Sequence, residues 1–569
     1  MKYFLRVNLT EKSIIKEDVP EKYQLYGGRL LTSSLINDEV DPLCDPIGPD
    51  NKLVLAAGLL GGVNIAGSGR LSAGAKSPLT GGIKESNAGG TFARRMSNHG
   101  LRAIILEGKS TEQNLVLEIR KDGITLNNYP DLKMKGVYDC TLILQKQYGT
   151  DWGICLIGPA GEMRLASACI NNVDTKGIPS RVNGRGGLGS VMGSKGLKAI
   201  VVEPSPGTPS QAKKQKEIKE VIKEFTEIIQ KHPMTPIYQR YGTILMTQHA
   251  LRLGSMPCYN FRQGSMPNTE HLKAENLTKV IEDRGGEGTP THGCIPGCIM
   301  KCSNIYPDKD GKSLVAPLEY ENLIMLGPNI GITDVDQIAA LNYIANDLGV
   351  DTIEIGAALG VAMDCGVLNF NDYEQARSAM EGIYQGTVLG RLLGQGAYMT
   401  GKILGATRIP VVKGQSMAAY DPRTFKGIGV TYATSPMGAD HTAGHTLRFP
   451  VDHHQAEGQI EASLNAQKDI NVYDSLGLCN FTLPQTIAKP EVLAALVSNY
   501  YDVDFDTSDL RNIGTEVIRT EYTFNRRAGF TNNDDCLPDF MLNEPLPPTN
   551  KVFDVNLAGM KNIYKDILK

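Results

Sequence analysis

Two segments of the chain repeat each other at a fixed spacing. GLRAIILE at residues 100–107 matches GLKAIVVE at residues 196–203, a constant offset of 96 positions. Each is preceded four residues upstream by a methionine, Met96 or Met192, and by a glycine loop, NAGG at 87–90 or NGRGGLG at 183–189. Internal similarity of this kind indicates a duplicated structural unit. We therefore expect two related N-terminal halves whose glycine loops face the same way, able to bind two similar ligands or one pseudo-symmetric ligand.

The secondary-structure pattern changes after the second repeat. Short runs such as LRVNL, LVLAA, AIILEG, NLVLEI and AIVVE predict strands within residues 1–203. PSPGTPSQ, 204–211, contains three prolines and predicts a linker, and KKQKEIKEVIKEFTEIIQKH after it predicts an amphipathic helix. Helical patterns dominate the remainder. The predicted fold class is α+β, with a β-rich, pseudo-two-fold domain over 1–205 and two mainly α-helical domains over 212–410 and 411–569.

Cysteine content and charge exclude several classes of protein. The eleven cysteines are an odd number, and the N-terminal MKYFLRVNLTEK lacks an apolar stretch of signal-peptide length. We expect a reducing, cytoplasmic compartment. The longest apolar run, 53–67, is shorter than the ~20 residues of a membrane span. A net charge of −4 gives no global attraction for nucleic acid. We therefore expect neither a membrane span nor a nucleic acid partner.

The glycine loops are candidate phosphate sites. Gly184, Gly186 and Gly189 match G-x-G-x-x-G, but the dinucleotide motif needs a strand directly before it, and the preceding NNVDTKGIPS is polar and broken by proline. Exposed backbone N–H groups beside arginines bind phosphate well. The candidate side chains are Arg181 and Arg185 in the second loop and Arg70, Lys76, Asn87 and Gly89 in the first. The alternative is ordinary turn chemistry with solvated arginines.

Two hexapeptides in the helical part share a pattern. NDLGVD (346–351) and DSLGLC (474–479) both contain Leu-Gly between polar residues, and the first ends a helical pattern where a capping glycine is expected. Each alone is typical of a helix C-cap. Their similarity favours a shared ligand-binding role as the second interpretation.

Three cysteines recur at every fourth residue in HGCIPGCIMKC, residues 292–302. A continuous helix would place Cys294, Cys298 and Cys302 on one stripe, but Pro296 and Gly297 break helices. The spacing leaves three interpretations. These are an iron–sulfur cluster with a distant fourth thiolate, for which Cys479 is the candidate; a zinc site completed by His292; and buried thiols.

The motifs together resemble the aldehyde ferredoxin oxidoreductases, which hold tungsten, or molybdenum in some relatives, between two pyranopterin dithiolenes beside a [4Fe–4S] cluster. The resemblance is carried, in the family's order, by GRLSAGAKSPLTGGIKESNAGG, RVNGRGGLGSVMGSKGLKAI, GCIPGCIMKC, LEYEN, NDLGVDTIEIG and DSLGLC, and it runs over nearly the whole chain. It departs from the family's pattern at two points. The first gap between the cluster cysteines has three residues instead of two, and Asn346 stands where the family often has aspartate.

The resemblance implies a role for each group of residues. The pterin phosphates and a bridging Mg²⁺ would lie among Arg70, Asn87, Gly89, Arg181, Gly184 and Arg185. One pterin would contact Asn346, Gly349, Val350 and Asp351, and the other Asp474 and Leu478. The [4Fe–4S] ligands would be Cys294, Cys298, Cys302 and Cys479.

The implied reaction converts an aldehyde and water to a carboxylic acid, with electrons leaving through the cluster to ferredoxin or an iron–sulfur or flavin partner subunit, in a homodimer or hetero-oligomer. Glu321 in LEYEN is the expected general base, and His441 in MGADHTAGH the expected hydrogen-bond donor to the carbonyl, with His445 as the substitute. A buried ion pair and a structural histidine are the alternatives for Glu321 and His441. Two other functions remain open: the tungsten subunit of a class II benzoyl-CoA reductase acting on an aromatic acyl-CoA, and a zinc-stabilised anion-binding protein.

Overall fold

The computed structural model describes residues 2–206 and 215–569. Its N-terminal part contains two six-stranded sheets with matching topology. The first sheet has the order β2-β1-β6-β3-β4-β5 and the second the order β8-β7-β12-β9-β10-β11, so strands six apart in number occupy equivalent places. The first consists of β1 Tyr3–Asn8, β2 Ser13–Asp18, β3 Leu53–Ala57, β4 Leu71–Lys76, β5 Ile83–Ala88 and β6 Leu101–Glu107. The second consists of β7 Leu115–Ile119, β8 Ile124–Asn128, β9 Gly153–Leu156, β10 Ile170–Asn172, β11 Arg181–Asn183 and β12 Leu197–Val202.

Pairing and helices repeat as well. β1 pairs with β6 in parallel, as β7 pairs with β12, whereas the neighbouring pairs are antiparallel. Helix α1 (Gly28–Glu39) corresponds to α3 (Val137–Tyr148), and α2 (Phe92–Asn98) corresponds to α5 (Leu188–Ser194). The predicted duplication is confirmed, and the repeated segments form the third strand of each sheet.

The repeated strands are buried on both faces, which explains their continuous apolar sequence. In β6, Ile104 faces a core shared by the two sheets, and Ile105 faces α1 on the opposite side. In β12, Ile200 and Val201 divide in the same way between the shared core and the α3 side. Burying each such aliphatic side chain stabilises the fold by about 1.5–3 kcal/mol.

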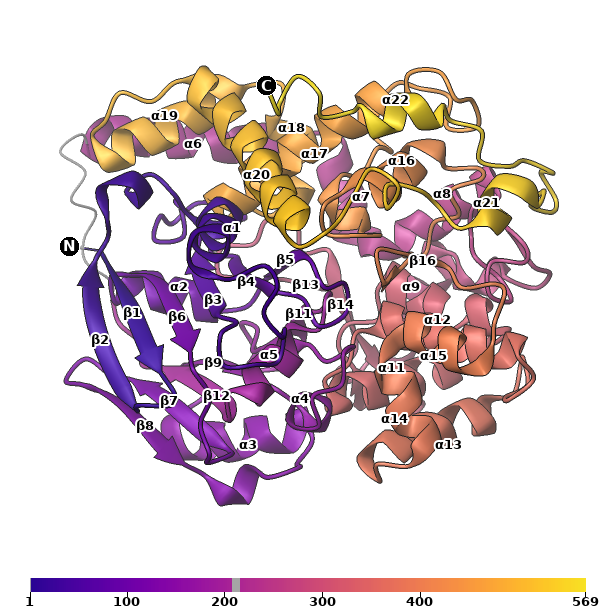
Figure 1. The fold of residues 1–569 in the computed structure, drawn as a ribbon, viewed down its shortest axis with the longest axis horizontal. Coiled ribbons are helices and arrows are strands. Elements are labelled where there is room, and N and C mark those ends of the chain that lie inside the picture. The colour runs from indigo at the N-terminus through magenta and orange to yellow at the C-terminus, as the bar shows by residue number, and fades with distance from the viewer. Residues whose placement is uncertain (1, 207–214) are drawn as a thin grey trace.

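The remainder of the chain is mainly helical, as predicted, and lies beside and above the sheets (Figure 1). Its first helices are α6 Gln215–Lys231, α7 Met234–Tyr241, α8 Met246–Leu253 and α9 Ala274–Arg284. A small sheet consists of β13 Thr289–His292, β14 Ser303–Pro307 and β15 Ser313–Val315, and the cysteine loop connects β13 to β14. The helices α10 Tyr320–Met325, α11 Val335–Leu348 and α12 Thr352–Asp364 follow. Then come α13 Tyr373–Tyr384, α14 Val388–Gly394, α15 Gly396–Leu404, β16 Val411–Val412 and β17 Gln415–Ser416. The last helices are α16 Lys426–Thr434, α17 Gln459–Leu476, α18 Leu483–Thr486, α19 Pro490–Tyr501, α20 Thr507–Arg527, α21 Asp539–Asn543 and α22 Leu557–Lys561.

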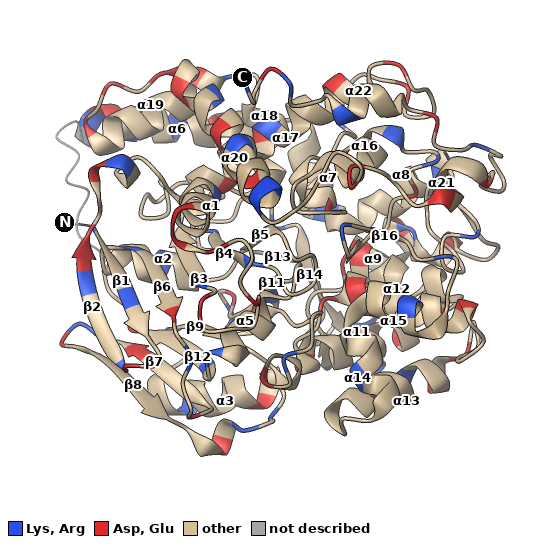
Figure 2. Cartoon of the chain, viewed as in Figure 1, with Lys and Arg blue, Asp and Glu red and all other residues tan. Residues whose placement is uncertain are grey.

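The predicted amphipathic helix is α6, which packs against α19 (Figure 1). Phe225 and Ile229 on its apolar side are fully buried, and its lysines and glutamates lie on the solvated side. The predicted linker, 204–211, falls largely outside the described residues. Basic and acidic residues are interspersed over the elements (Figure 2). Among the described helices, none is long and apolar enough to cross a membrane.

Candidate functional site

The two hexapeptides end α11 and α17 in the same way. Gly349 follows α11 with φ 72° and Gly477 follows α17 with φ 73°, a left-handed conformation that glycine adopts at low cost. The expected C-cap role is therefore confirmed for both. Each cap also contacts an N-terminal half, because Val350 forms a β-bridge with Ala168 and Leu478 forms one with Ser68. The helix ends are thus held against equivalent places in the duplicated domain.

A second pair of glycines makes this close approach possible. A Cβ on Gly58 would lie 2.2 Å from the backbone of Gly477, and a Cβ on Gly158 would lie 2.3 Å from the carbonyl oxygen of Leu348. Backbone also meets backbone through hydrogen bonds: the Gly69 amide donates to Gly477 at 3.1 Å, and the Cys169 amide donates to Gly349 at 2.9 Å. Two matching sites therefore lie between the sheets and the helical part. We call them seats: the first is at residues 346–351, after α11, and the second at residues 474–479, at the end of α17.

Each seat contains a buried aspartate with an arginine. Asp351 begins α12 as its N-cap, accepting from the amide of Ile353 at 3.0 Å, and accepts from Arg185 Nε at 3.1 Å. Asp474 on α17 lies 3.6 Å from Arg29 Nη1. Burial raises the pKa of Asp474 to about 6, although Arg29 opposes this shift.

Three further charged residues of the second seat were not singled out from the sequence. Arg29 donates to both carboxylate oxygens of Glu521 at 2.8 Å, and Glu85 lies within electrostatic range of Asp474. Burial raises the pKa of Glu85 to about 8, and Asp474 adds to that increase. Arg29 and Glu521 are 492 positions apart, so no local pattern marks the pair.

In the first seat, Asn346 is buried and its Nδ2 donates to the hydroxyl of Tyr138 on α3 at 3.4 Å. The amide is thus used to join the hexapeptide to the second N-terminal half. An aspartate here could accept a hydrogen bond but could not donate one through an amide.

The arginines of the glycine loops make specific contacts. Arg70 donates to the side chain and backbone oxygens of Asn87. Arg181 donates to Ser303 at 3.0 Å and to Glu319 at 3.3 Å. Gly89 lies between this region and the cysteines. A Cβ at this position would lie 3.2 Å from Cys294 Sγ and 3.4 Å from Arg181, so glycine lets both side chains approach closely. Arg70 and Arg181 both lie within electrostatic range of Cys294, so these residues are close together. Lys76 instead donates to the carbonyl oxygens of Pro42 and Cys44.

One expectation about the second glycine loop is wrong. Strand β11, Arg181–Asn183, lies between the polar segment and Gly184 and directly precedes the loop, and helix α5 follows the loop. β11 forms because it pairs with β10 in an antiparallel arrangement, a tertiary contact that outweighs its polar sequence. The antiparallel pairing differs from the parallel β-α-β unit of dinucleotide-binding folds.

The structure brings the four predicted cysteines together. Cys294 and Cys479 belong to one buried cluster against which Cys298 packs, and Cys302 lies within electrostatic range of both Cys294 and Cys479. The pKa of Cys294 is lowered to about 6 by a hydrogen bond with Cys298, opposed by burial and assisted by Arg181 and Arg70. A lowered thiol pKa favours the thiolate, which is the form that binds metals.

His292 does not complete this set. Its Nε2 lies 2.7 Å from Asp174, which also accepts a hydrogen bond from Ser180 at 2.7 Å. The interpretation in which His292 is a fourth zinc ligand is therefore not supported. Within the described ranges, no set of three or more His, Cys, Asp or Glu side chains is arranged to hold a single metal ion.

Glu321 and His441 form a pair near the first seat. Glu321 Oε2 accepts from the amide of Ala419 at 2.8 Å, and Oε1 lies 3.2 Å from His441 Nε2. Glu321 Oε1 and His441 Nδ1 have no hydrogen-bond partner within the described protein. Burial raises the pKa of Glu321, and the nearby His441 opposes this shift. The arrangement can therefore accept a proton and donate a hydrogen bond at adjacent atoms.

His445 has different surroundings. Its ring centre lies 6.5 Å from that of His441 and 4.9 Å from that of Tyr420, and its Nδ1 accepts from the Leu447 amide at 3.3 Å. Burial lowers the pKa of His445 to about 3, so that its imidazole is neutral near pH 7. The structure therefore brings His441, and not His445, to Glu321.

Comparison with known proteins covers almost the whole chain. Family models described as "Aldehyde ferredoxin oxidoreductase, N-terminal domain" and "Aldehyde ferredoxin oxidoreductase, domains 2 & 3" match residues 4–204 and 220–566. Tungsten-containing aldehyde ferredoxin oxidoreductases of Pyrococcus furiosus and Thermococcus kodakarensis are each 31% identical to this chain, covering 99% of it and 94% of the relative. The active-site complex of benzoyl coenzyme A reductase with 1,5-dienoyl-CoA contains a chain with the same fold. Its TM-score is 0.82 at 20% identity, over 99% of this chain and 94% of that one.

Proposed function

We propose, from the premise that this chain belongs to the aldehyde ferredoxin oxidoreductase family, that it oxidises an aldehyde to the corresponding carboxylic acid. Two electrons would leave through a [4Fe–4S] cluster to ferredoxin or to a partner subunit. The observation that carries this proposal is the Glu321–His441 pair, whose facing atoms are 3.2 Å apart and which retains two unpartnered polar atoms.

The two seats fit a tungsten, or molybdenum, bis-pyranopterin. Asp351 and Asp474 are acceptors suited to pterin amino and ring N–H groups, and Arg29 Nη1 is a buried donor with no hydrogen-bond partner within the described protein. Beside Gly184, no atom of the described residues lies within 4 Å of an added Cβ, which leaves room for a ligand at the loop. Arg70, Asn87 and Arg181 would then lie near the pterin phosphates and a bridging Mg²⁺. When bound, the metal supplies a two-electron acceptor next to the substrate.

The four cysteines fit a [4Fe–4S] cluster. Such a cluster needs four thiolates, and its sulfur ligands are farther apart than those around one zinc ion, because the iron and sulfide atoms fill the space between them. Arg70 and Arg181 add positive charge beside Cys294, which favours its thiolate. The three-residue first gap is accommodated by Gly297, which adopts φ 73°.

Two side chains of this protein would carry out the proton transfer and hold the substrate. Glu321 Oε1 would accept a proton from the water that adds to the aldehyde, since burial already raises the affinity of this carboxylate for a proton. His441 would donate a hydrogen bond to the substrate oxygen and hold the carbonyl beside Glu321. The balance is one aldehyde and one water giving one carboxylic acid, two protons and two electrons.

The test is anaerobic purification from a tungstate-fed host, followed by an aldehyde panel with ferredoxin or a viologen dye as the acceptor. Aldehyde-dependent reduction that is lost in Glu321→Gln at unchanged metal content supports the proposal. Reduction of an aryl-CoA by the same preparation, with no aldehyde oxidised, would overturn it.

A further inference from the structure

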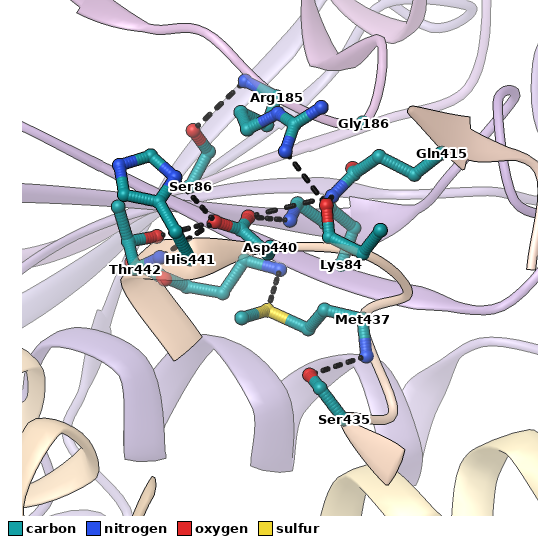
Figure 3. Close-up of polar contacts among 12 residues, drawn as sticks. Lys84, Ser86, Arg185, Gly186, Gln415, Ser435, Met437, Asp440, His441 and Thr442 are labelled. Atoms are coloured by element: carbon teal, nitrogen blue, oxygen red, sulfur yellow. Dashed lines mark hydrogen bonds and ion pairs between the residues drawn. The ribbon is translucent and has the colours of Figure 1, made fainter. Parts of the chain in front are cut away.

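The turn that carries His441 begins with a buried aspartate (Figure 3). Asp440 Oδ1 accepts from the Thr442 amide at 3.0 Å and from the Thr442 hydroxyl at 2.7 Å. This is the geometry of an N-cap, in which the side chain holds the first turn in place. Only 2% of the Asp440 side chain is exposed, so its charge requires a partner.

That partner comes from the N-terminal domain. Lys84 on β5 is 356 positions away, has a side-chain exposure of 0%, and donates from Nζ to Asp440 Oδ2 at 2.5 Å. Gly186 makes this path available, because a Cβ at that position would lie 2.3 Å from Lys84 Cγ. This glycine of the G-x-G-x-x-G loop therefore leaves room for the Lys84 side chain to reach Asp440.

The residue before Asp440 is also fixed. The Ala439 carbonyl oxygen accepts from Arg185 Nη1 at 2.7 Å and from Gln415 Nε2 at 2.9 Å. Gln415 also lies 3.5 Å from Asp440 Oδ2 (Figure 3). The backbone on both sides of the carboxylate is thus held, which fixes where the His441 side chain leaves the backbone.

Two carboxylates and the Tyr420 ring lie near the His441 ring. Glu321 from α10 faces Nε2 at 3.2 Å, and Asp440 Oδ1 lies 3.9 Å from Nδ1. His445 packs nearby on the same loop. Lys84 and Arg185 lie behind Asp440, and although burial alone would raise the pKa of Asp440, these two cations hold it well below its usual range. The carboxylate is therefore ionised and balanced by cations that the His441 ring does not contact.

We propose that Lys84 and Asp440 are positioning residues for His441, with Asp440 fixing the turn and Lys84 balancing the carboxylate. The pair sets where the imidazole lies and how strongly it binds a proton. This inference rests on the proposed function only for the role of His441 in the reaction, and its geometry is independent of the substrate.

The test is a cycle of variants in the purified holoenzyme. Lys84→Met removes the cation that donates to the carboxylate and leaves Arg185 as its remaining cation, Asp440→Asn removes the negative charge 3.9 Å from His441 and keeps a capping side chain, and the double variant removes both charges. Lys198→Met is the matched control, because Lys198, on β12 of the second sheet, also has 0% side-chain exposure and pairs with a carboxylate, Glu162, away from the turn. Each protein is treated with diethyl pyrocarbonate across a pH series, and modification of His441 is followed by peptide mass spectrometry.

The pH midpoint of His441 modification is expected to rise in Lys84→Met and to fall in Asp440→Asn. Each shift should be about one pH unit, the size expected when one charge is lost near the imidazole and solvent screens part of its effect. It returns close to the wild-type value in the double variant and does not move in Lys198→Met. A midpoint unchanged in both single variants, or one that the double variant fails to restore, would overturn the proposal. If Lys84→Met does not fold, Asp440→Asn alone must lower the midpoint. Shifted midpoints in a protein that oxidises no aldehyde would refute the proposed function and leave the positioning pair in place.

Discussion

Replacing Gly58 with alanine should open one of the two seats without disturbing the other. The new Cβ would lie 2.2 Å from Gly477, so the backbone after α17 must move by about 1 Å or more to reach ordinary contact. The Leu59 and Leu60 amides donate to the carbonyl oxygens of Ser475 and Leu476, the last two residues of α17, at 3.1 and 3.0 Å, and a shift of this size next to them weakens both bonds. Overpacking costs about 1–3 kcal/mol and each bond contributes about 1 kcal/mol, so the total is at least about 3 kcal/mol. A loss of about 3 kcal/mol raises the open population roughly 100-fold.

Hydrogen exchange measured by mass spectrometry reports this opening locally. The amides of Leu59 and Leu60 should exchange roughly 100-fold faster in Gly58→Ala. The displaced segment leads directly to Cys479, whose amide donates to Gly67 at 2.7 Å, so iron content should fall too.

Gly158→Ala is the matched control, because its Cβ would meet the Leu348 carbonyl oxygen at 2.3 Å in the seat that contains none of the four cysteines. It should speed exchange at Cys169, whose amide donates to Gly349, and leave iron content unchanged. Unchanged protection at Leu59 and Leu60 in Gly58→Ala, or equal iron loss in both variants, would refute the two-seat argument.

Three further predictions concern the reaction site and the cysteines. Glu321→Gln should lower kcat for aldehyde oxidation about 10²- to 10⁴-fold at unchanged tungsten and iron content; an unchanged kcat would exclude Glu321 as the base. The base must be deprotonated, and burial raises its pKa above 4.5, so kcat should fall as pH drops through that raised pKa. His441→Gln removes the imidazole whose electrostatic effect lowers the pKa of Glu321. The pH at which kcat falls on the acid side should therefore move to a higher value, and a move to a lower value would contradict the pairing. Cys479→Ala should destroy or convert the cluster while much of the pterin stays bound, and an unaltered EPR spectrum of the reduced protein would contradict that assignment.

The duplicated domain could be predicted because its signal is local. The apolar strands β6 and β12 recur with their preceding glycine loops, so similarity between two short segments was enough to infer two halves. The same is true of Gly349 and Gly477, since a helical pattern followed by glycine predicts a C-cap from a few residues. The convergence of the four cysteines agrees with the prediction, in which Cys479 was the candidate because of its context in DSLGLC and was then implied by the family resemblance.

The charged partners could not be predicted in this way. Arg29 pairs with Glu521 across 492 positions and Lys84 with Asp440 across 356, and a lone charged residue in the sequence carries no information on which distant residue it will meet. His292 shows the opposite error, because its nearness to the cysteines in sequence suggested a ligand, whereas the fold places Asp174 beside it. Strand β11 was missed because its pairing with β10 is tertiary.

The central claim is that this chain holds a bis-pyranopterin metal centre next to a [4Fe–4S] cluster. Metal analysis by mass spectrometry of protein purified anaerobically from a tungstate-fed host with active cofactor maturation tests it most directly. A bis-pyranopterin centre and a [4Fe–4S] cluster would give about one tungsten or molybdenum and about four iron atoms per chain. Zinc near one per chain, with neither tungsten, molybdenum nor iron, would contradict it.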